Sequence, residues 1–107
     1  MPSFANPFVG NVNRKMTDQE LANAIRLDIA GELEAIYLYD AHAAATDNEL
    51  AKKVLADIRD EEKQHMGELL TLLMHLDPTE KELFDHGAGE VREMMEELEK
   101  IGKKKKK

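Results

Sequence analysis

The chain contains no cysteine among its 107 residues. Disulfides, zinc–thiolate sites, iron–sulfur clusters and thiol nucleophiles are therefore excluded from it. Proline and glycine are also scarce, with three and six residues, so few positions break a helix. The helix formers Ala, Leu, Glu, Lys and Met dominate the remainder, and this composition predicts an all-α fold.

Basic residues are few outside the C-terminus. Fifteen Lys and Arg stand against 22 Asp and Glu, and five of the lysines are residues 103–107. The rest of the chain is thus strongly acidic, which argues against nucleic-acid binding and permits the binding of cations. Charges interrupt every apolar stretch before it reaches membrane-spanning length, and no signal peptide is recognised. We therefore expect a cytoplasmic protein without a membrane partner.

The length predicts one small domain. Residues 1–16 hold two of the three prolines, so we expect an irregular N-terminal arm that either docks through Phe4 and Phe8 or stays disordered. Residues 17–101 form the predicted helical domain, and residues 102–107 form a lysine tail, either solvated or bound to an anionic partner. A chain of this size buries little surface, which favours an oligomer.

Two capping boxes mark the starts of two long helices: Thr17-Asp-Gln-Glu20 and Thr46-Asp-Asn-Glu49. We therefore expect the first helix to end near Ala45. The second should run from about Asp47 to Leu76, because proline follows at position 78 and cannot continue the hydrogen-bond ladder. Two helices of similar length joined by a tight turn make an antiparallel hairpin.

The C-terminal third predicts less regular structure. The segment Asp77-Pro78-Thr79-Glu80 predicts a short turn of helix, His86-Gly-Ala-Gly89 a break, and residues 90–101 a third, shorter helix. The apolar residues of this third helix share one side, which favours a packing face over a cofactor site. They are Val91, Met94, Met95, Leu98 and Ile101.

Both long helices carry a stripe of residues whose spacings alternate between three and four, typical of the core-facing side of a helical bundle. The first stripe is Ala22, Ile25, Ile29, Glu32, Ile36, Tyr39 and Ala43. The second is Ala51, Leu55, Ile58, Glu62, His65, Leu69, Leu72 and Leu76. Three members of these otherwise apolar stripes are ionisable: Glu32, Glu62 and His65.

The predicted hairpin places these three residues at one height. Glu32 and Glu62 both stand roughly 21–23 Å from the turn at about 1.5 Å per residue, and His65 lies one helical turn further along. Neither stripe contains Lys or Arg, so a cation best compensates two buried carboxylates. Glu-x-x-His is weak evidence in a Glu-rich chain, but its place opposite a second carboxylate predicts a site for iron, manganese or zinc.

One chain supplies half of a di-metal site. Di-iron carboxylate bundles use four helices, two with a lone Glu and two with Glu-x-x-His, and this chain has one of each. The remaining histidines, His42, His75 and His86, have no Glu three positions earlier. A two-fold dimer of hairpins would complete the site.

At this point the sequence resembles a known family, the encapsulated ferritins. The resemblance rests on Gly31-Glu-Leu-Glu-Ala-Ile-Tyr-Leu-Tyr-Asp40 and Arg59-Asp-Glu-Glu-Lys-Gln-His65, and covers most of residues 17–100. It implies a ferritin-like four-helix bundle formed by dimerisation, in which Glu32, Glu62 and His65 of both subunits bind two irons. It further implies ferroxidase activity, with Mn, Zn or Ca able to substitute for iron, and an annular decamer inside, or fused to, an encapsulin shell that stores the mineral.

The resemblance also assigns roles outside these ligands. Tyr39 matches a tyrosine beside the centre, and could bond a ligand, donate one electron or merely pack. Glu34 lies off the stripe and would normally be solvated, but it matches an outer site through which metal ions enter. Gly31 stands where some members carry Glu, which implies an altered outer site. No encapsulin-targeting tail is recognised, so either such a segment is missing here or the chain acts outside a shell.

Two other functions fit the same residues. A rubrerythrin-like di-iron peroxidase would need a separate electron donor, because the chain has no cysteines for a rubredoxin domain. A non-enzymatic helical interaction module or metal buffer would use the polar residues of the stripes only to set helix register.

Overall fold

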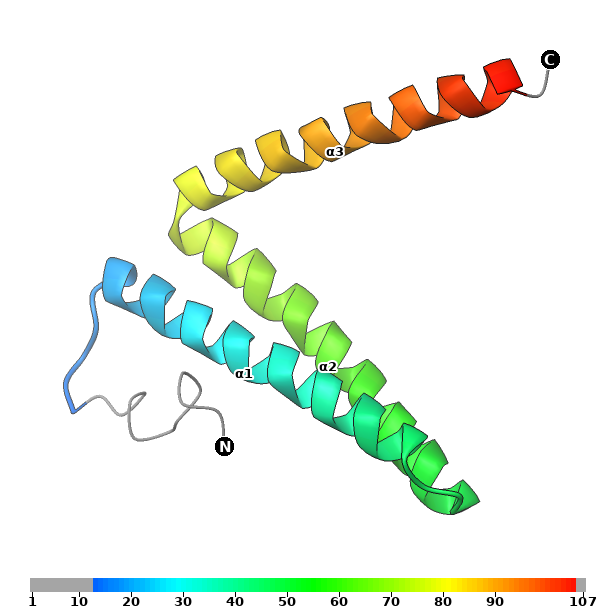
Figure 1. The fold of residues 1–107 in the computed structure, drawn as a ribbon. Coiled ribbons are helices and arrows are strands. Elements are labelled where there is room, and N and C mark those ends of the chain that lie inside the picture. Colours follow the sequence, from blue (N-terminus) through cyan, green and yellow to red (C-terminus); the bar gives the residue numbers. More distant parts are fainter. Residues whose placement is uncertain (1–12, 106–107) are drawn as a thin grey trace.

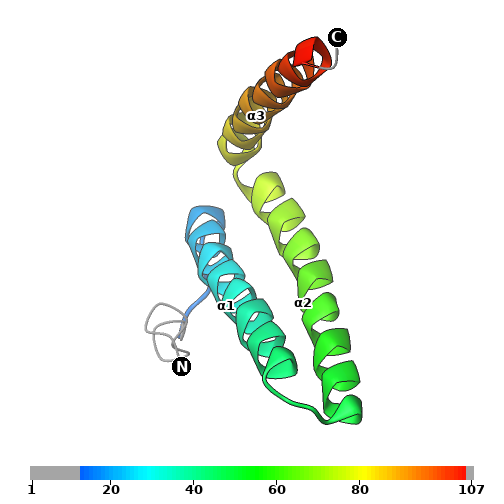
Figure 2. The same ribbon diagram turned by 45° about the vertical axis from the view of Figure 1, so that its right-hand side comes forward.

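The computed structural model describes residues 13–105, which form three α-helices and no strand: α1 (Asp18–Ala44), α2 (Glu49–Leu76) and α3 (Pro78–Lys105). This confirms the predicted all-α class. The expectations for residues 1–12 and for the last two lysines lie outside the described residues. Helices α1 and α2 lie side by side and run in opposite directions, whereas α3 projects away from them (Figures 1 and 2). None of the described helices combines the length and apolar character needed to cross a membrane.

Helix α1 begins with the predicted capping box. The hydroxyl of Thr17 accepts a hydrogen bond from the Glu20 amide at 3.2 Å, and the Glu20 carboxylate accepts one from the Thr17 amide at 3.0 Å. The helix ends at Ala44, where the amide of Ala45 still donates to the carbonyl groups of the preceding turn. Both ends thus lie where the sequence predicts them.

The predicted capping box at the start of α2 is wrong. Asn48 is the N-cap, and its side-chain oxygen accepts from the amide of Ala51 at 3.0 Å. The hydroxyl of Thr46 instead accepts from the Asn48 amide at 3.2 Å, so it orders the turn before the helix. An asparagine caps a helix at least as well as a threonine. Asn48 therefore caps the helix in place of Thr46, and α2 begins at Glu49.

The predicted break at His86–Gly89 is also wrong. Helix α3 runs without interruption from Pro78 to Lys105, and takes in both the predicted short turn and part of the lysine tail. No glycine among the described residues has a positive φ angle. Glycine costs a helix about 1 kcal/mol relative to alanine, but it keeps its N–H group, so Gly87 and Gly89 weaken the ladder without ending it.

The hydrophobic core is small and lies near the open end of the hairpin. Among the described residues, the buried apolar side chains are Ala22, Ile25 and Leu73. Leu73 is 2% exposed although it is absent from the predicted stripe, whereas its predicted neighbour Leu72 is 40% exposed. A straight helix drifts about 20° per heptad from an exact seven-residue repeat. Three heptads after Ala51, this drift brings residue 73 rather than 72 onto the buried face.

Helix α3 carries a row of apolar side chains that the described part of the chain leaves largely uncovered. Their exposed fractions run from 43% at Phe84 to 68% at Leu98. The row consists of Leu83, Phe84, Val91, Met94, Met95, Leu98 and Ile101. The predicted apolar side of the third helix therefore exists, and within one chain it faces solvent rather than a core.

Candidate metal centre

The hairpin brings Glu32, Glu62 and His65 together. Each residue offers one ligand atom, and the three atoms lie within 4.8 Å of one another. Glu32 comes from α1, while Glu62 and His65 lie one turn apart on α2, so the cluster depends on the register between the helices. Described residues elsewhere form no other group of this kind.

The His65 imidazole lies near both carboxylates of the cluster but too far away to form a hydrogen bond with either. The Nδ1 atom of His65 lies 3.6 Å from Oε2 of Glu62 and 3.8 Å from Oε2 of Glu32. Both separations exceed the usual N–H···O range of about 2.7–3.2 Å. The carboxylate side chains are 26% exposed at Glu32 and 18% at Glu62, against 50% for the imidazole. The cluster therefore opens toward the surface on the side of His65.

One oxygen of the cluster is buried without a partner. Within the described part of the chain, Oε2 of Glu32 is inaccessible to solvent and accepts no hydrogen bond. Leaving a carboxylate oxygen buried and unsatisfied is unfavourable, and a bound cation removes that cost. A buried carboxylate oxygen without a hydrogen bond is compatible with a cation site at Glu32.

Among residues 13–104, whose side chains the structure describes, no Lys or Arg pairs with these carboxylates. The nearest basic residues on α2 pair with other acids: Arg59 with Asp40 at 2.7 Å, and Lys63 with Asp60 at 3.8 Å. Glu32 and Glu62 therefore have no Lys or Arg partner among the described residues. Two carboxylates and an imidazole are a donor set that suits iron, manganese or zinc.

Two further predicted residues lie on α1 after Glu32. Tyr39 is partly buried on α1, two turns from Glu32. Glu34 departs from the expectation of a solvated side chain, because its Oε2 atom is buried and accepts no hydrogen bond within the described chain. An acidic side chain with an unsatisfied oxygen is compatible with a second cation position, and its role remains a prediction.

The bridge between Arg59 and Asp40 is a feature that the sequence reasoning missed. Asp40 lies on α1 and Arg59 on α2, one turn before Glu62, so their bond joins the two helices between the cluster and the turn. The bonds from Asp40, and then from Asp60, raise the pKa of Arg59 above its ordinary value, because they stabilise the charged guanidinium. Asp40 ends the first motif of the family resemblance and Arg59 begins the second, and this placement is the feature of the sequence that could have indicated the bridge.

A ferritin-like helical hairpin is the class of protein that this fold and this carboxylate–imidazole cluster define. Residues 19–77, which contain all three clustered residues, match the family model described as "Ubiquinone biosynthesis protein COQ7". A solved structure of similar fold is the encapsulated ferritin domain from Pyrococcus furiosus, with a TM-score of 0.74 and 40% sequence identity. That match covers 82% of this chain and 90% of the solved one.

Two characterised relatives carry related names. The chain is 55% identical over 73 residues to the encapsulin nanocompartment cargo protein EncC of Myxococcus xanthus, covering 68% of this chain and 56% of that protein. It is 39% identical over 89 residues to the ferritin-like–encapsulin shell fusion protein of Pyrococcus furiosus, covering 83% of this chain and 26% of that protein. The chain belongs to the encapsulated ferritin family, as the sequence motifs predicted. It spans only about half, or less, of each of these two relatives.

Proposed function

We propose that this chain is one half of a ferroxidase. In this proposal two copies related by a two-fold axis bring together Glu32, Glu62 and His65 from each, and the joint site oxidises Fe(II) to Fe(III). The observation that carries it is the uncompensated cluster, with its buried and unpartnered Glu32 oxygen, on a hairpin of this family. Iron is the substrate here, rather than a permanent cofactor.

Dimerisation follows from the number of ligands. One chain supplies three ligand side chains, which are too few for two ions. The most exposed of them, His65, lies on the open side of the cluster, where a second hairpin could add its own three. An isologous two-fold contact supplies a matching set without any further component, giving four carboxylates and two imidazoles.

The chemistry assigns a distinct task to each group. Two Fe(II) ions each lose one electron, and dioxygen takes up the two electrons and two protons to form hydrogen peroxide. The carboxylates of Glu32 and Glu62 offset the additional positive charge as Fe(III) forms. The imidazole of His65 supplies a nitrogen ligand, and a metal binds only the neutral form of this ring.

Two further residues of α1 have secondary roles in this proposal. Tyr39 either orients a ligand carboxylate or donates one electron, and Tyr39→Phe separates these roles, because only the second changes the number of electrons delivered per dioxygen. Glu34 collects ions at the outer site, where its buried oxygen lacks a donor. The glycine at position 31 removes a carboxylate from that site, so Gly31→Glu should change the kinetics of iron uptake.

We further propose that the dimers assemble into a larger ring and act with an encapsulin shell. The support is the naming of two relatives, one as encapsulin cargo and one as a fusion with the shell protein. The protein would then work inside a nanocompartment that retains the oxidised iron. Co-expression with a shell protein, followed by isolation of intact shells, tests this part separately from catalysis.

The oxidation itself is tested by adding Fe(II) under nitrogen and then admitting air. Absorbance in the near ultraviolet should rise while dioxygen is consumed, in a protein that native mass spectrometry shows to be at least dimeric. Glu62→Gln should slow this reaction by about 100-fold or more, because even indirect support of a metal ligand is worth about 10–100-fold. Glu61→Gln, an exposed neighbour, is the matched control and should change it less than about two-fold.

Other outcomes would overturn the proposal. Full activity of Glu62→Gln would contradict the assignment of Glu62 as a metal ligand. Oxidation of iron by a monomer would contradict a site formed between two chains. Turnover that depends on hydrogen peroxide without iron loading would indicate a rubrerythrin-like peroxidase. Absence of both responses would indicate a helical metal-binding or interaction module.

A further inference from the structure

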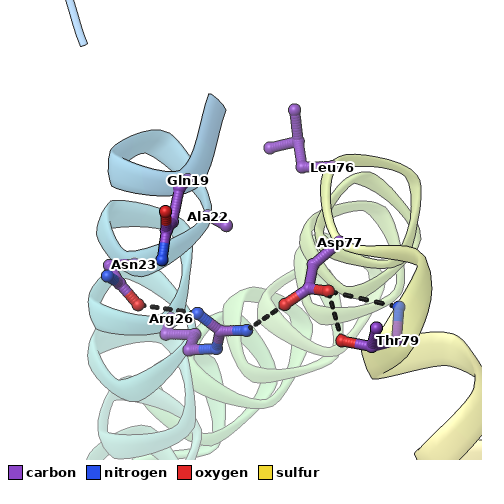
Figure 3. Close-up of a pocket in the computed structure, with 7 residues that line it drawn as sticks. All are labelled: Gln19, Ala22, Asn23, Arg26, Leu76, Asp77 and Thr79. Atoms are coloured by element: carbon purple, nitrogen blue, oxygen red, sulfur yellow. Dashed lines mark hydrogen bonds and ion pairs between the residues drawn. The ribbon is translucent and has the colours of Figure 1, made fainter. Parts of the chain in front are cut away.

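All three helices are joined at one residue, Asp77 (Figure 3). Its amide donates to the carbonyl of Leu73 at 2.9 Å and so closes the last turn of α2. Its Oδ1 atom accepts from the amide and hydroxyl of Thr79, at 3.2 and 2.6 Å, and so opens the first turn of α3. Its Oδ2 atom accepts from Arg26 of α1 at 2.9 Å.

Arg26 holds the start of α3 at two points. The same Nη2 atom that reaches Asp77 lies 2.9 Å from Oε2 of Glu80, while Nη1 donates to Asn23 at 2.7 Å. The side chains are 38% exposed at Arg26 and 19% at Glu80, so the pair is partly shielded from water. Both carboxylates raise the pKa of Arg26, Glu80 more than Asp77, which keeps the guanidinium charged.

Glu80 is available for this contact because the junction already uses the Asp77 amide. In a usual capping box, the Glu at the third helical position bonds back to the N-cap amide. Here that amide donates to Leu73 in α2. The carboxylate of Glu80 therefore turns to Arg26, and makes the only side-chain hydrogen bond between α1 and α3 in residues 13–105.

Little else fixes the direction of α3. Asp77 is the one non-helical residue between α2 and α3, with φ of -132° and ψ of 91°. Beside the junction lies an open cavity of about 350 Å³, lined by Gln19, Ala22 and Leu76 among others. Side-chain packing therefore does not fix the angle between α2 and α3 at Asp77. Further along, the large apolar residues of α3 from Leu83 onward are all at least 43% exposed.

We propose that Arg26 is the residue that locks the direction of α3 relative to the hairpin. A helix of 28 residues is about 42 Å long, so a rotation of roughly 20° at Asp77 moves its far end by about 15 Å. With Arg26 bound to both Asp77 and Glu80, this rotation is blocked and the apolar row of α3 is presented in one direction. Without those bonds, α3 swings about the elbow while α1 and α2 stay paired.

The absence of cysteine makes the direction of α3 directly measurable. Cysteines introduced as Lys53→Cys and Glu96→Cys place spin labels at exposed positions of α2 and α3. Electron paramagnetic resonance then gives the distribution of distances between them, with labelled chains diluted in unlabelled ones so that only distances within one chain are seen. The parent protein should give one narrow peak, and Arg26→Gln should broaden it or shift it by several ångströms.

Two further variants keep the test sharp. Glu80→Gln breaks the bond from the other side and should reproduce the effect of Arg26→Gln. Arg59→Gln removes the other bridging arginine, which contacts α1 and α2 only, and should leave the peak unchanged. Circular dichroism checks that each variant keeps its helices, as expected because the bonds removed join side chains and lie outside the backbone hydrogen-bond ladders of the helices. An unchanged peak in Arg26→Gln, or equal broadening in Arg59→Gln, would overturn the proposal.

Discussion

The Nδ1 atom of His65 lies 3.8 Å from Oε2 of Glu32, across the interface between two antiparallel helices. Only one register between α1 and α2 allows this proximity, because a shift of one residue turns a side chain by about 100° around its helix. The Asp40–Arg59 bridge near the turn and the buried Leu73 near the open end maintain that register on either side. The cluster is thus a consequence of how the whole hairpin packs.

The clustered carboxylates should destabilise the metal-free protein. They lie within one 4.8 Å cluster and have no Lys or Arg partner among the described residues, so Glu62→Gln removes a like-charge repulsion. We expect the free energy of unfolding at pH 7 in excess chelator to rise by about 0.5–1 kcal/mol, which thermal denaturation would show. Added Mn(II) should then stabilise the parent protein and not the variant. A variant less stable than its parent without metal would contradict this.

Adjacent leucines on α2 should differ sharply in their contribution to stability. Leu73→Ala removes a side chain that is 2% exposed and should cost about 2–4 kcal/mol, because it leaves a cavity in a small core. Leu72→Ala, at 40% exposure, should cost about 1 kcal/mol or less. Urea denaturation of both variants measures the difference. Equal losses would mean that the buried face of α2 is assigned to the wrong residue.

Helix capping at the start of α2 should depend on Asn48 and not on Thr46. Asn48→Ala removes the acceptor for the Ala51 amide and should lower the free energy of unfolding by about 1 kcal/mol. Thr46→Ala removes a bond within the turn and should cost a few tenths of that. Thermal denaturation of the two single variants tests the order, and a larger loss at Thr46 would restore the capping box predicted from the sequence.

The first turn of α1 should respond to acid through Glu20. Arg14, and then the Thr17 amide, bond its carboxylate and lower its pKa to about 2 from an ordinary 4.5. A lowered pKa stabilises the fold above the ordinary value, and this contribution is lost as the pH falls from about 4.5 toward 2. The melting temperature of the parent should therefore exceed that of Glu20→Gln at pH 7, and the difference should vanish near pH 2. A difference that persists there would point to packing instead.

Glycine at position 87 should make α3 easier to open. An added Cβ at Gly87 meets no atom within 4 Å, and its φ is not positive, so alanine fits without strain. Gly87→Ala should stabilise this part of the helix by about 1 kcal/mol, which corresponds to roughly five-fold slower amide hydrogen exchange. Amides of α1 serve as the internal control and should exchange at unchanged rates. Equal exchange in α3 before and after the change would imply a break that the continuous helix does not have.

The sequence predicted the hairpin and its family because those features depend on local patterns. The alternating spacing of apolar residues indicates which face of each helix is buried, and equal distances from the turn place Glu32 opposite Glu62. Both inferences tolerate an error of one or two residues at a helix end. The second helix indeed begins at Glu49 rather than near Asp47 without displacing the cluster.

Other features of the fold could not be predicted from the sequence, because neighbouring residues with similar properties compete for the same role or because the contact joins distant parts of the chain. Thr46 and Asn48 are both good caps, and only their backbone geometry decides between them. The heptad pattern selected Leu72 over Leu73 because it ignores the drift of a straight helix. The contact of Arg26 with Glu80 joins residues far apart in the chain, so no local pattern indicates it.

The uncovered side of α3 has a practical consequence for anyone handling the isolated chain. Seven large apolar side chains are exposed in one row, and an exposed apolar surface of this kind favours contacts between chains. Raising the protein concentration should therefore promote aggregation of the isolated chain. The hairpin can remain folded while neighbouring molecules stick to one another through their third helices. Solubility and folding are therefore governed by different parts of this small protein.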